Sequence, residues 1–419
     1  MSKSSLIVGL DIGTTKICAV VGKQFECEQT QAADGNILEI LGIGLVNSTG
    51  LRNGVVVDIE KTVNSIRKAI EHAELLAGCK IGEVYVGIAG RHISSINSPG
   101  MVTIKGGEIG QTDIDRVLDS AKTIAIPADR EVIHIIPQEY IVDGQRGIVN
   151  PIGMAGVRLQ ANVHIVTGAV TSVQNIMRSC RHSQLEVADI ALESIASAKS
   201  VLSPEEREIG VALVDIGGGT TDIAIFNNNA IKYTEVLPVG GQNLSNDIAF
   251  GLRTPLVSAE KIKIKYGSAL KDLVQNDELI EVPSVGGRQP RRISRKMLAE
   301  ICEPRMVEIL SLVKDSFERS GIQRNMLAGV VLTGGTSLTE GCQELGEQIF
   351  KCPTRIGLPR NIEGLKELVN NPACATAVGL LRIGVEKELS GQKKFSPPEE
   401  NKFFDGLLDR MKKWFSDVF

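Results

Sequence analysis

The chain is poor in aromatic side chains, since Phe, Trp and Tyr make up only 4% of its 419 residues. It also contains no run of roughly 18 apolar residues, the length that a membrane-spanning helix requires. The apolar stretch in MSKSSLIVGLDIG, at the N-terminus, is too short for a secretory signal and leads directly into a predicted strand. We therefore expect a cytosolic chain without a spanning helix.

Other absences exclude further classes. The eight cysteines are scattered and form no CxxC pair, so we expect reduced, mostly buried thiols and neither a disulfide framework nor a zinc site. A net charge of −4 argues against binding nucleic acid over the whole surface. No GxxxxGK[ST] occurs and no GxGxxG opens a helix after a strand, which disfavours P-loop and Rossmann proteins. What remains is a globular protein of 45.0 kDa with two or more domains.

The clearest positive feature is an internal repeat. VGLDIGTTKICAVVG begins at Val8 and VALVDIGGGTTDIAIF begins at Val211. Each copy reads as an apolar strand, Asp-Ile-Gly, a Gly/Thr turn and a second apolar strand. The two aspartates lie 215 − 11 = 204 residues apart, which predicts two related halves. A pair of ordinary hairpin turns is the alternative, and the near-identity of the two copies makes it less favoured.

The chemistry of such a turn indicates phosphate binding. Glycine lets the backbone approach an anion closely, so that successive N–H groups and Thr hydroxyls converge on phosphate oxygens. An Asp at the end of the strand would repel a bare phosphate, but it suits a hydrated Mg²⁺ lying between the two. Two facing turns therefore predict a polyphosphate held from both sides.

A third glycine turn, Thr333-Gly334-Gly335-Thr336, follows an apolar strand predicted at 330–332. The glycine pair would let a flat ring lie against bare backbone. Strand–Gly–Gly–helix connections are common, so this turn alone decides little.

Two stretches rich in small residues, ADIALESIASAKSVL and PACATAVGLLRIG, are predicted as helices that cross closely, as at a hinge. Ordinary buried alanines are the alternative. Glu193, in the first stretch, could orient a water toward a terminal phosphate, or it could be a solvated helix charge.

Longer motifs point to a known family. The strings at 11–15 (DIGTT), 215–222 (DIGGGTTD) and 332–336 (LTGGT) resemble the phosphate-1, phosphate-2 and adenosine motifs of the actin, sugar-kinase and heat-shock-chaperone superfamily. HIIPQEY at 134–140, NPIGMAGVRLQANVHIVTG from Asn150 and VPSVGGRQPR from Val282 resemble the FtsA family of bacterial cell-division proteins. This resemblance covers nearly the whole chain.

The resemblance implies an α/β, actin-like two-lobed ATPase fold of duplicated ribonuclease-H-like domains, followed by a C-terminal amphipathic helix. Its implied boundaries are 1–84, 164–195 and 355–383 for subdomain IA, 85–163 for the inserted IC, 196–243 and 305–354 for IIA, 244–304 for IIB, 384–401 for a flexible linker and 402–419 for a membrane-targeting helix.

The resemblance also implies ATP or ADP with Mg²⁺ between the lobes, and it assigns site residues by motif. Phosphates or metal would be contacted by Asp11, Gly13, Thr14, Thr15, Lys16, Asp215, Gly217, Gly218, Gly219, Thr220 and Thr221. The nucleoside would be contacted by Glu260, Lys263, Gly334, Gly335 and Thr336. Asp11 and Asp215 would hold Mg²⁺ through water, and Glu193 matches the acidic residue near the attacking water.

The scarce aromatic residues gather at the C-terminal end, FFDGLLDRMKKWFSDVF. On a helical projection the apolar side chains fall within an arc of roughly 160°. They are Phe403, Phe404, Leu407, Leu408, Met411, Trp414, Phe415, Val418 and Phe419. Packing on the chain's own domain is the general alternative. The preceding polar segment, with Pro397-Pro398, reads as a tether, so we favour a helix that binds the membrane surface.

A basic cluster is predicted to bind a partner. It comprises Arg288, Arg291, Arg292, Arg295 and Lys296. A solvated face is the alternative to docking of an acidic peptide. In the FtsA family the partner at subdomain IIB is the C-terminal tail of the tubulin-like FtsZ.

Together these features predict an ATP-binding, actin-like cell-division protein that forms filaments and anchors FtsZ to the cytoplasmic face of the inner membrane at mid-cell. Later division proteins would dock at subdomain IC, nucleic acid is not expected as a partner, and any ATPase turnover would be slow. The rival functions are a small-molecule kinase of the same superfamily and a chaperone-like ATPase. The second would need a peptide-binding domain for which the chain has no room.

Overall fold

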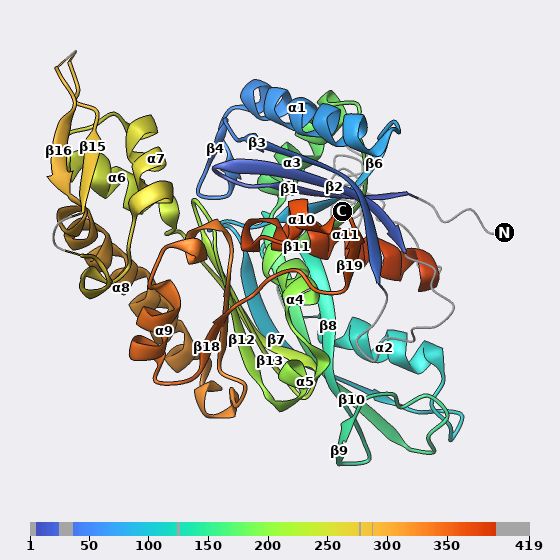
Figure 1. Cartoon of the computed structure of the whole chain (residues 1–419). Helices are drawn as coiled ribbons and strands as arrows, with labels where there is room; N and C mark the ends of the chain where they lie inside the picture. Colours follow the sequence, from blue (N-terminus) through green and yellow to red (C-terminus); the bar gives the residue numbers. More distant parts are fainter. Residues whose placement is uncertain (1–5, 25–36, 124–125, 276–277, 287, 391–419) are drawn as a thin grey trace, which may run out of the picture.

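The computed structural model describes residues 6–24, 37–123, 126–275, 278–286 and 288–390 (Figure 1). Three main sheets and their covering helices form a mixed α/β protein, as the sequence predicts. The two predicted phosphate hairpins lie at the centres of two different sheets, and this arrangement positions the site.

The first sheet has six strands in the order β11-β6-β1-β2-β3-β19. Their bounds are β1 Ile7–Ile12, β2 Lys16–Gln24, β3 Leu38–Asn47, β6 Glu83–Ile88, β11 Glu186–Leu192 and β19 Ile362–Gly364. β1 pairs antiparallel with β2 and parallel with β6. Side chains alternate between the two faces: one face packs on α1 (Ile59–Ala77) and α3 (Val170–His182), the other on α11 (Ala375–Ser390).

The second sheet repeats this pattern with five strands in the order β14-β13-β12-β17-β18. Their bounds are β12 Val211–Ile216, β13 Thr221–Asn227, β14 Ala230–Leu237, β17 Val330–Thr333 and β18 Thr354–Ile356. β12 pairs antiparallel with β13 and parallel with β17, as β1 does with β2 and β6. The duplicated hairpin seen in the sequence is therefore a duplicated sheet core.

A third, four-stranded sheet lies at the lower end of Figure 1, in the order β7-β10-β8-β9, with helix α2 against it. Its elements are β7 Ser94–Thr103, α2 Gln111–Ala121, β8 Arg130–Val142, β9 Gln145–Ile148 and β10 Arg158–Ala169. This sheet meets the second sheet through side chains that reach β14: Ser95 Oγ donates to Thr234 O over 2.8 Å, and His164 Nε2 lies 2.9 Å from Thr234 Oγ1.

A smaller unit of helices and one hairpin stands at the upper left of Figure 1. It contains α6 Gly241–Gly251, α7 Leu256–Tyr266, β15 Leu279–Val282, β16 Arg291–Ser294 and the start of α8 Arg295–Ser320. The remaining elements are β4 Leu51–Arg52, β5 Val55–Val56, α4 Glu193–Val201, α5 Pro204–Ile209, η1 Lys271–Leu273, η2 Gln323–Asn325, η3 Gly335–Leu338, α9 Cys342–Phe350, α10 Lys366–Val369 and η4 Pro372–Cys374.

Helices α4 and α11 cross closely, as their small residues predict. A Cβ built on Gly379 would lie 1.8 Å from the carbonyl oxygen of Ala196, so only glycine fits there. The first small-residue stretch is not helical throughout, because its residues 188–192 belong to strand β11. Short apolar runs do not separate helix from strand, and pairing with β6 decided this one.

The predicted subdomain boundaries stay predictions, with one difference at the C-terminal side. Helix α11 continues to Ser390, so residues 384–390 of the predicted linker are helical, and Val385 is buried in the core. The predicted membrane-targeting helix, 402–419, lies outside the described residues, as does Cys27. Within the described ranges, none of the helices is long and apolar enough to cross a bilayer.

Candidate functional site

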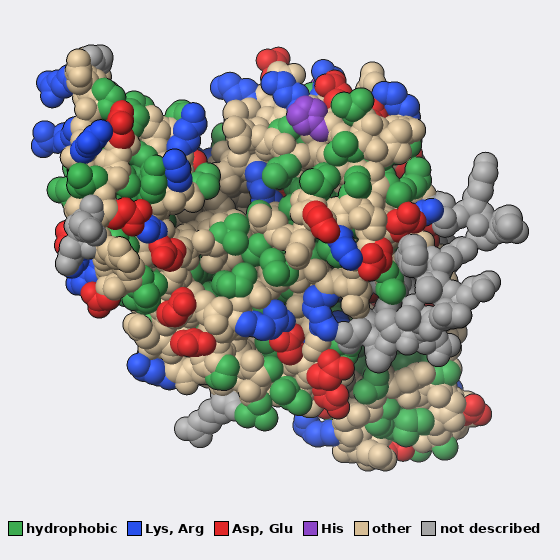
Figure 2. Space-filling model, in the orientation of Figure 1, with side chains coloured by type: hydrophobic (Ala, Val, Ile, Leu, Met, Phe, Trp, Pro, Cys, Tyr) green, Lys and Arg blue, Asp and Glu red, His purple; other side chains and the backbone are tan. Residues whose placement is uncertain are grey.

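A cleft of about 570 Å³ lies between the two hairpins, and both of them line it. The space-filling view shows the hollow between the α6–α7 unit and the first sheet (Figure 2). The turns touch: a Cβ on Gly218 would lie 2.3 Å from Thr15 Oγ1, and one on Gly219 would lie 2.4 Å from Thr14 Oγ1. Because Gly218 and Gly219 have no side chains, the backbone of the second turn lies against the Thr14 and Thr15 hydroxyls of the first. Backbone groups and hydroxyls that meet in one small volume are suited to binding a phosphate.

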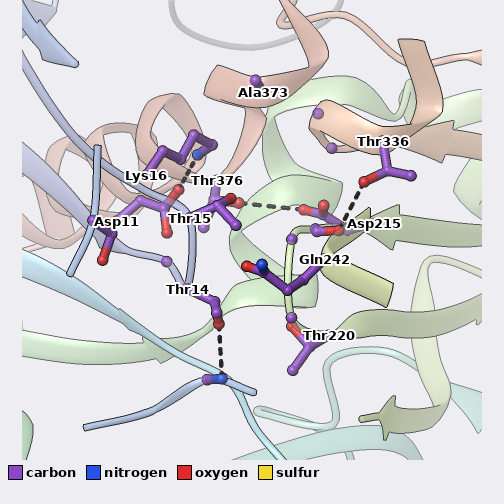
Figure 3. A pocket seen from close by; sticks show the side chains of 18 of the residues that line it. Asp11, Thr14, Thr15, Lys16, Asp215, Thr220, Gln242, Thr336, Ala373 and Thr376 are labelled. Carbon is purple, nitrogen blue, oxygen red and sulfur yellow. Dashed lines mark hydrogen bonds and ion pairs between the residues drawn. The ribbon is translucent and has the colours of Figure 1, made fainter. Parts of the chain in front are cut away.

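Asp11 is the penultimate residue of strand β1 and is 3% exposed. Its Oδ2 lies 2.5 Å from Nζ of Lys16, across the turn (Figure 3). Burial lowers the pKa of Lys16, but attraction to Asp11 and Cys18, the hydrogen bond to Asp11 and attraction to Cys374 together raise this pKa above its ordinary value. The first hairpin thus carries a permanently charged ammonium group into the cleft.

Asp215 occupies the matching position on β12. Its Oδ2 accepts hydrogen bonds from Ser197 Oγ over 2.6 Å and from Thr376 Oγ1 over 3.2 Å. Ser197 comes from α4 and Thr376 from α11, so this carboxylate joins the second sheet to the crossing helices. Burial raises its pKa, although the Ser197 hydrogen bond opposes that shift.

Two further carboxyl groups face the cleft. Asp222 is 3% exposed, and its Oδ1 has no hydrogen-bond partner among the described residues. Burial, and then the Asp215 carboxylate, raise the pKa of Asp222 to about 8. Burial, and then Asp11, raise the pKa of Glu193 well above its usual range. Four carboxyl groups around one ammonium leave this site short of positive charge.

This donor set suits a hydrated divalent cation. Oxygen ligands are those that Mg²⁺ prefers, and the buried, unpartnered Asp222 oxygen is the kind of atom that a coordinated water would satisfy. Within the described part of the chain, no three His, Cys, Asp or Glu residues are arranged to hold a metal directly. That Asp11 and Asp215 hold Mg²⁺ through water stays a prediction, in which Asp222 would be an additional acceptor.

We predict that the unliganded protein loses about 1 kcal/mol of unfolding free energy between pH 7 and pH 8 because of Asp222. A carboxyl whose folded pKa exceeds its unfolded value stabilises the fold while the native state keeps the proton, and that stability disappears as pH rises through the folded pKa. Urea denaturation at pH 7 and pH 8 measures the total change, and Asp222→Asn should remove the part that Asp222 contributes, while the part from Glu193, whose pKa is also raised, stays. An equal change in unfolding free energy between pH 7 and pH 8 in both proteins would contradict the assignment of this effect to Asp222.

The buried histidines do not contribute to the change in stability between pH 7 and pH 8. Burial lowers the pKa values of His92, His134 and His164 to about 4. Their contribution is therefore lost as pH falls below about 6.5, the usual unfolded value, and is constant above it.

The side of the cleft that is predicted to hold the nucleoside is built from the third glycine turn and from α6 and α7. Thr336 Oγ1 donates to Gly217 O over 2.8 Å, which fastens this turn to the second hairpin. Gly334 has φ +83°, and a Cβ there would lie 2.3 Å from Asp215 Oδ1. Lys263 Nζ contacts Glu260 Oε2 at 2.8 Å and Gly241 O at 3.1 Å.

The structure brings every predicted nucleotide residue but one to this cleft, Glu193 included. The exception is Thr221, which is fully buried and whose hydroxyl donates to Val239 O over 2.8 Å. Side chains alternate along β13, so Thr221 points away and Asp222 points in. Among the lining residues that sequence reasoning missed are Asp222, Gln242, Ala373 and Thr376. Alternation after the turn would have found Asp222; the others depend on tertiary contacts.

The predicted basic cluster lies on β16, the start of α8 and the loop before them, at the tip of the upper-left unit (Figure 2). Arg295 is engaged inside the protein: it pairs with Glu278 at 3.0 Å and with Glu340, and its Nε donates to Tyr266 O. Arg291 donates to Leu252 O. Arg288 and Arg292 are exposed, and they remain the best candidates for meeting a partner.

Comparison with known families gives two matches. The family model of the cell division protein FtsA matches residues 212–379, and that of the SHS2 domain inserted in FtsA matches residues 90–167.

Full-length relatives agree with these matches. The chain is 50% identical to the cell division protein FtsA of Pseudomonas aeruginosa, over 99% of this chain and 98% of that protein. It is 44% identical to that of Neisseria meningitidis, covering 98% of each chain, and 42% identical to that of Escherichia coli K12, covering 92% of each.

Solved structures show the same fold at low identity. The PilM–PilN type IV pilus biogenesis complex matches with a TM-score of 0.65 at 17% identity, covering 90% of this chain and 98% of that one. MreB5 of Spiroplasma citri bound to ADP matches with a TM-score of 0.53 at 16% identity, covering 92% and 99%. The actin-like fold predicted from the motifs is thus confirmed.

Proposed function

Because the chain belongs to the FtsA family of cell division proteins, we propose that it is an ATP-binding, actin-like protein that polymerises and anchors FtsZ filaments to the cytoplasmic membrane. The observation that carries this proposal is the two-sided cleft, in which the turns after β1 and β12 face each other across about 570 Å³. A cleft of this size suits a nucleoside di- or triphosphate.

Different residues would bind the phosphates and the nucleoside of ATP or ADP. Backbone N–H groups of the two turns, with Thr14, Thr15 and Thr220, would donate to phosphate oxygens, and Lys16 would add a positive charge. Glu260 and Lys263, with the third glycine turn, would position the nucleoside. Mg²⁺, when bound, would neutralise phosphate charge and lower the pKa values of the surrounding carboxyl groups.

Glu193 begins α4 at the edge of this site and is suited to orient a water toward the terminal phosphate. Burial and the neighbouring carboxylates raise its pKa, which favours the neutral form, and a neutral carboxyl group is a poor base. We therefore expect at most a slow ATPase, in which the nucleotide state regulates assembly and sustained turnover is not the function.

The membrane contact is proposed for residues 402–419 on their sequence, since they lie outside the described residues. Burial of even half of nine large apolar side chains would yield several kcal/mol at about 25 cal/mol per Å². One such helix would bind reversibly, and a filament carrying many would bind firmly because each later contact is intramolecular.

We expect Trp414→Glu to weaken ATP-dependent sedimentation with anionic phospholipid vesicles by about tenfold, because it replaces the largest apolar side chain of this face with a charged one. Ser416→Glu introduces the same charge on the opposite face and is the matched control, with little expected effect. Unchanged sedimentation of Trp414→Glu would refute the proposed tether.

The protein would also bind partner proteins at the division site. The FtsZ tail would bind subdomain IIB beside Arg288 and Arg292, and later division proteins would dock at subdomain IC, the sheet of β7–β10. Copies of the chain would associate into filaments at the division site, on the cytoplasmic face of the inner membrane. Nucleic acid is not a proposed partner, given the net charge of −4.

A further inference from the structure

A second cavity, of about 550 Å³, lies away from the nucleotide cleft, where three parts of the fold meet. Strand β8 forms one wall, α4 and α11 form another, and α5 with the turn between β13 and β14 forms the third. Nothing in the proposed function uses it. Its residues are His134, Ile136, Pro137, Asp189, Ile195, Ala198, Lys199, Arg207, Phe226, Asn229, Ala230, Ile231, Ile383, Glu386 and Lys387.

The floor of this cavity is apolar. Ile195 and Ile383 come from the two crossing helices, Phe226 and Ile231 from the second sheet, and Ile136 from β8. Phe226, Ile231 and Ile383 are at most 7% exposed, so they belong to the core and present a fixed surface. Such a surface suits an apolar ligand body.

Of the five charged side chains that line the cavity, three are positive and two are negative. Lys199 pairs with Glu386, and Lys387 pairs with Asp189. Arg207 is the fifth charge, and its buried Nε has no hydrogen-bond partner among the described residues. A buried guanidinium N–H without an acceptor is costly, and a planar carboxylate is the group that best satisfies it.

We propose that this cavity binds a small amphipathic anion, an apolar carboxylic acid whose carboxylate meets Arg207 and whose hydrocarbon body covers the isoleucine and phenylalanine floor. The volume lies within the range of sites for small organic ligands. The unsatisfied Nε–H of Arg207, whose charge also interacts with Glu205, favours an anion over a neutral or cationic molecule of the same shape.

The position of the cavity gives such a ligand a regulatory role. Helix α4 starts at Glu193 in the nucleotide cleft and reaches the cavity with Ala198 and Lys199. Helix α11 likewise carries Thr376 at the cleft and Glu386 at the cavity. The close backbone contact where Gly379 meets Ala196 couples the positions of the two helices. A ligand that fixes one end should therefore change nucleotide affinity at the other, and nucleotide should change ligand affinity equally.

Calorimetric titration of the full chain with decanoate, below its micelle concentration and without nucleotide, tests the binding site. We expect saturable binding of one decanoate, no comparable binding of 1-decanol, and roughly tenfold weaker binding to Arg207→Gln. Arg207→Lys should keep part of the affinity. Ala230→Trp, which fills the cavity without changing charge, should abolish binding, whereas Arg181→Gln on the distant helix α3 is the matched control and should bind normally.

Equal binding of decanoate and decanol, or unchanged binding to both Arg207→Gln and Ala230→Trp, would overturn the site. Thermal melting of each variant verifies its fold. The regulatory step rests on the proposed nucleotide function and has its own readout: saturating decanoate should change the dissociation constant of Mg-ADP several-fold. An unchanged constant overturns the coupling alone, and absence of Mg-ADP binding would instead refute the proposed function.

Discussion

Replacing Gly379 by alanine is expected to lower the free energy of unfolding by on the order of 3 kcal/mol and the melting temperature by roughly 5–10 °C. The new Cβ would lie 1.8 Å from the carbonyl oxygen and 2.3 Å from the carbonyl carbon of Ala196, so α4 and α11 would have to separate. Alanine is the better helix former by about 1 kcal/mol, and the backbone clash exceeds that gain.

The separation would also reach the nucleotide cleft, because Ser197 of α4 and Thr376 of α11 both donate to Asp215. We therefore expect nucleotide affinity to fall together with stability. Gly82→Ala is the matched control, since a Cβ at Gly82 has no heavy atom within 4 Å. Equal melting temperatures for Gly379→Ala and Gly82→Ala would contradict the close crossing.

Replacing Asp215 by asparagine is expected to weaken Mg-ATP binding by on the order of a hundredfold while leaving the unliganded protein at least as stable as the parent. The raised pKa of Asp215 shows that its charge is unfavourable in the free fold. Asparagine keeps an oxygen for Ser197 and Thr376, but it removes the charge that a hydrated Mg²⁺ needs.

Titration with a fluorescent ATP analogue, with Mg²⁺ and then with EDTA, separates the two effects. The loss of ATP affinity in Asp215→Asn should be large with Mg²⁺ and small with EDTA. Asp272→Asn is the control, since Asp272 is exposed and lies outside the cleft. Full Mg-ATP affinity in Asp215→Asn would exclude the proposed metal role.

Sequence reasoning reached most of this site because a repeated Asp-Ile-Gly turn after an apolar strand is a local pattern with a chemical meaning. It predicted that Asp11 and Asp215 face one site, and both line the same cleft, since each turn follows directly from its own strand. It included Thr221, which does not line the cleft, because it did not follow the alternation of side chains along β13, which identifies Asp222 instead.

Contacts between segments far apart in the chain could not be predicted from local sequence patterns. Thr376 and Ser197 meet at Asp215 because α4 and α11 cross, a pairing across 179 residues. The extent of α11 was underestimated because the polar residues after Ile383 suggested a linker, although Val385 is in the core. The cavity beside Arg207 has no local pattern, since β8, α4, α5, β13, β14 and α11 all contribute to it.

Flotation of FtsZ polymers with anionic vesicles, in the presence of this protein and Mg-ATP, tests the central proposal most directly. We predict that FtsZ rises with the vesicles only when the protein and nucleotide are both present. Trp414→Glu and Asp215→Asn should each leave FtsZ at the bottom of the gradient. Flotation of FtsZ at the parent level with either variant would contradict a nucleotide-dependent membrane anchor.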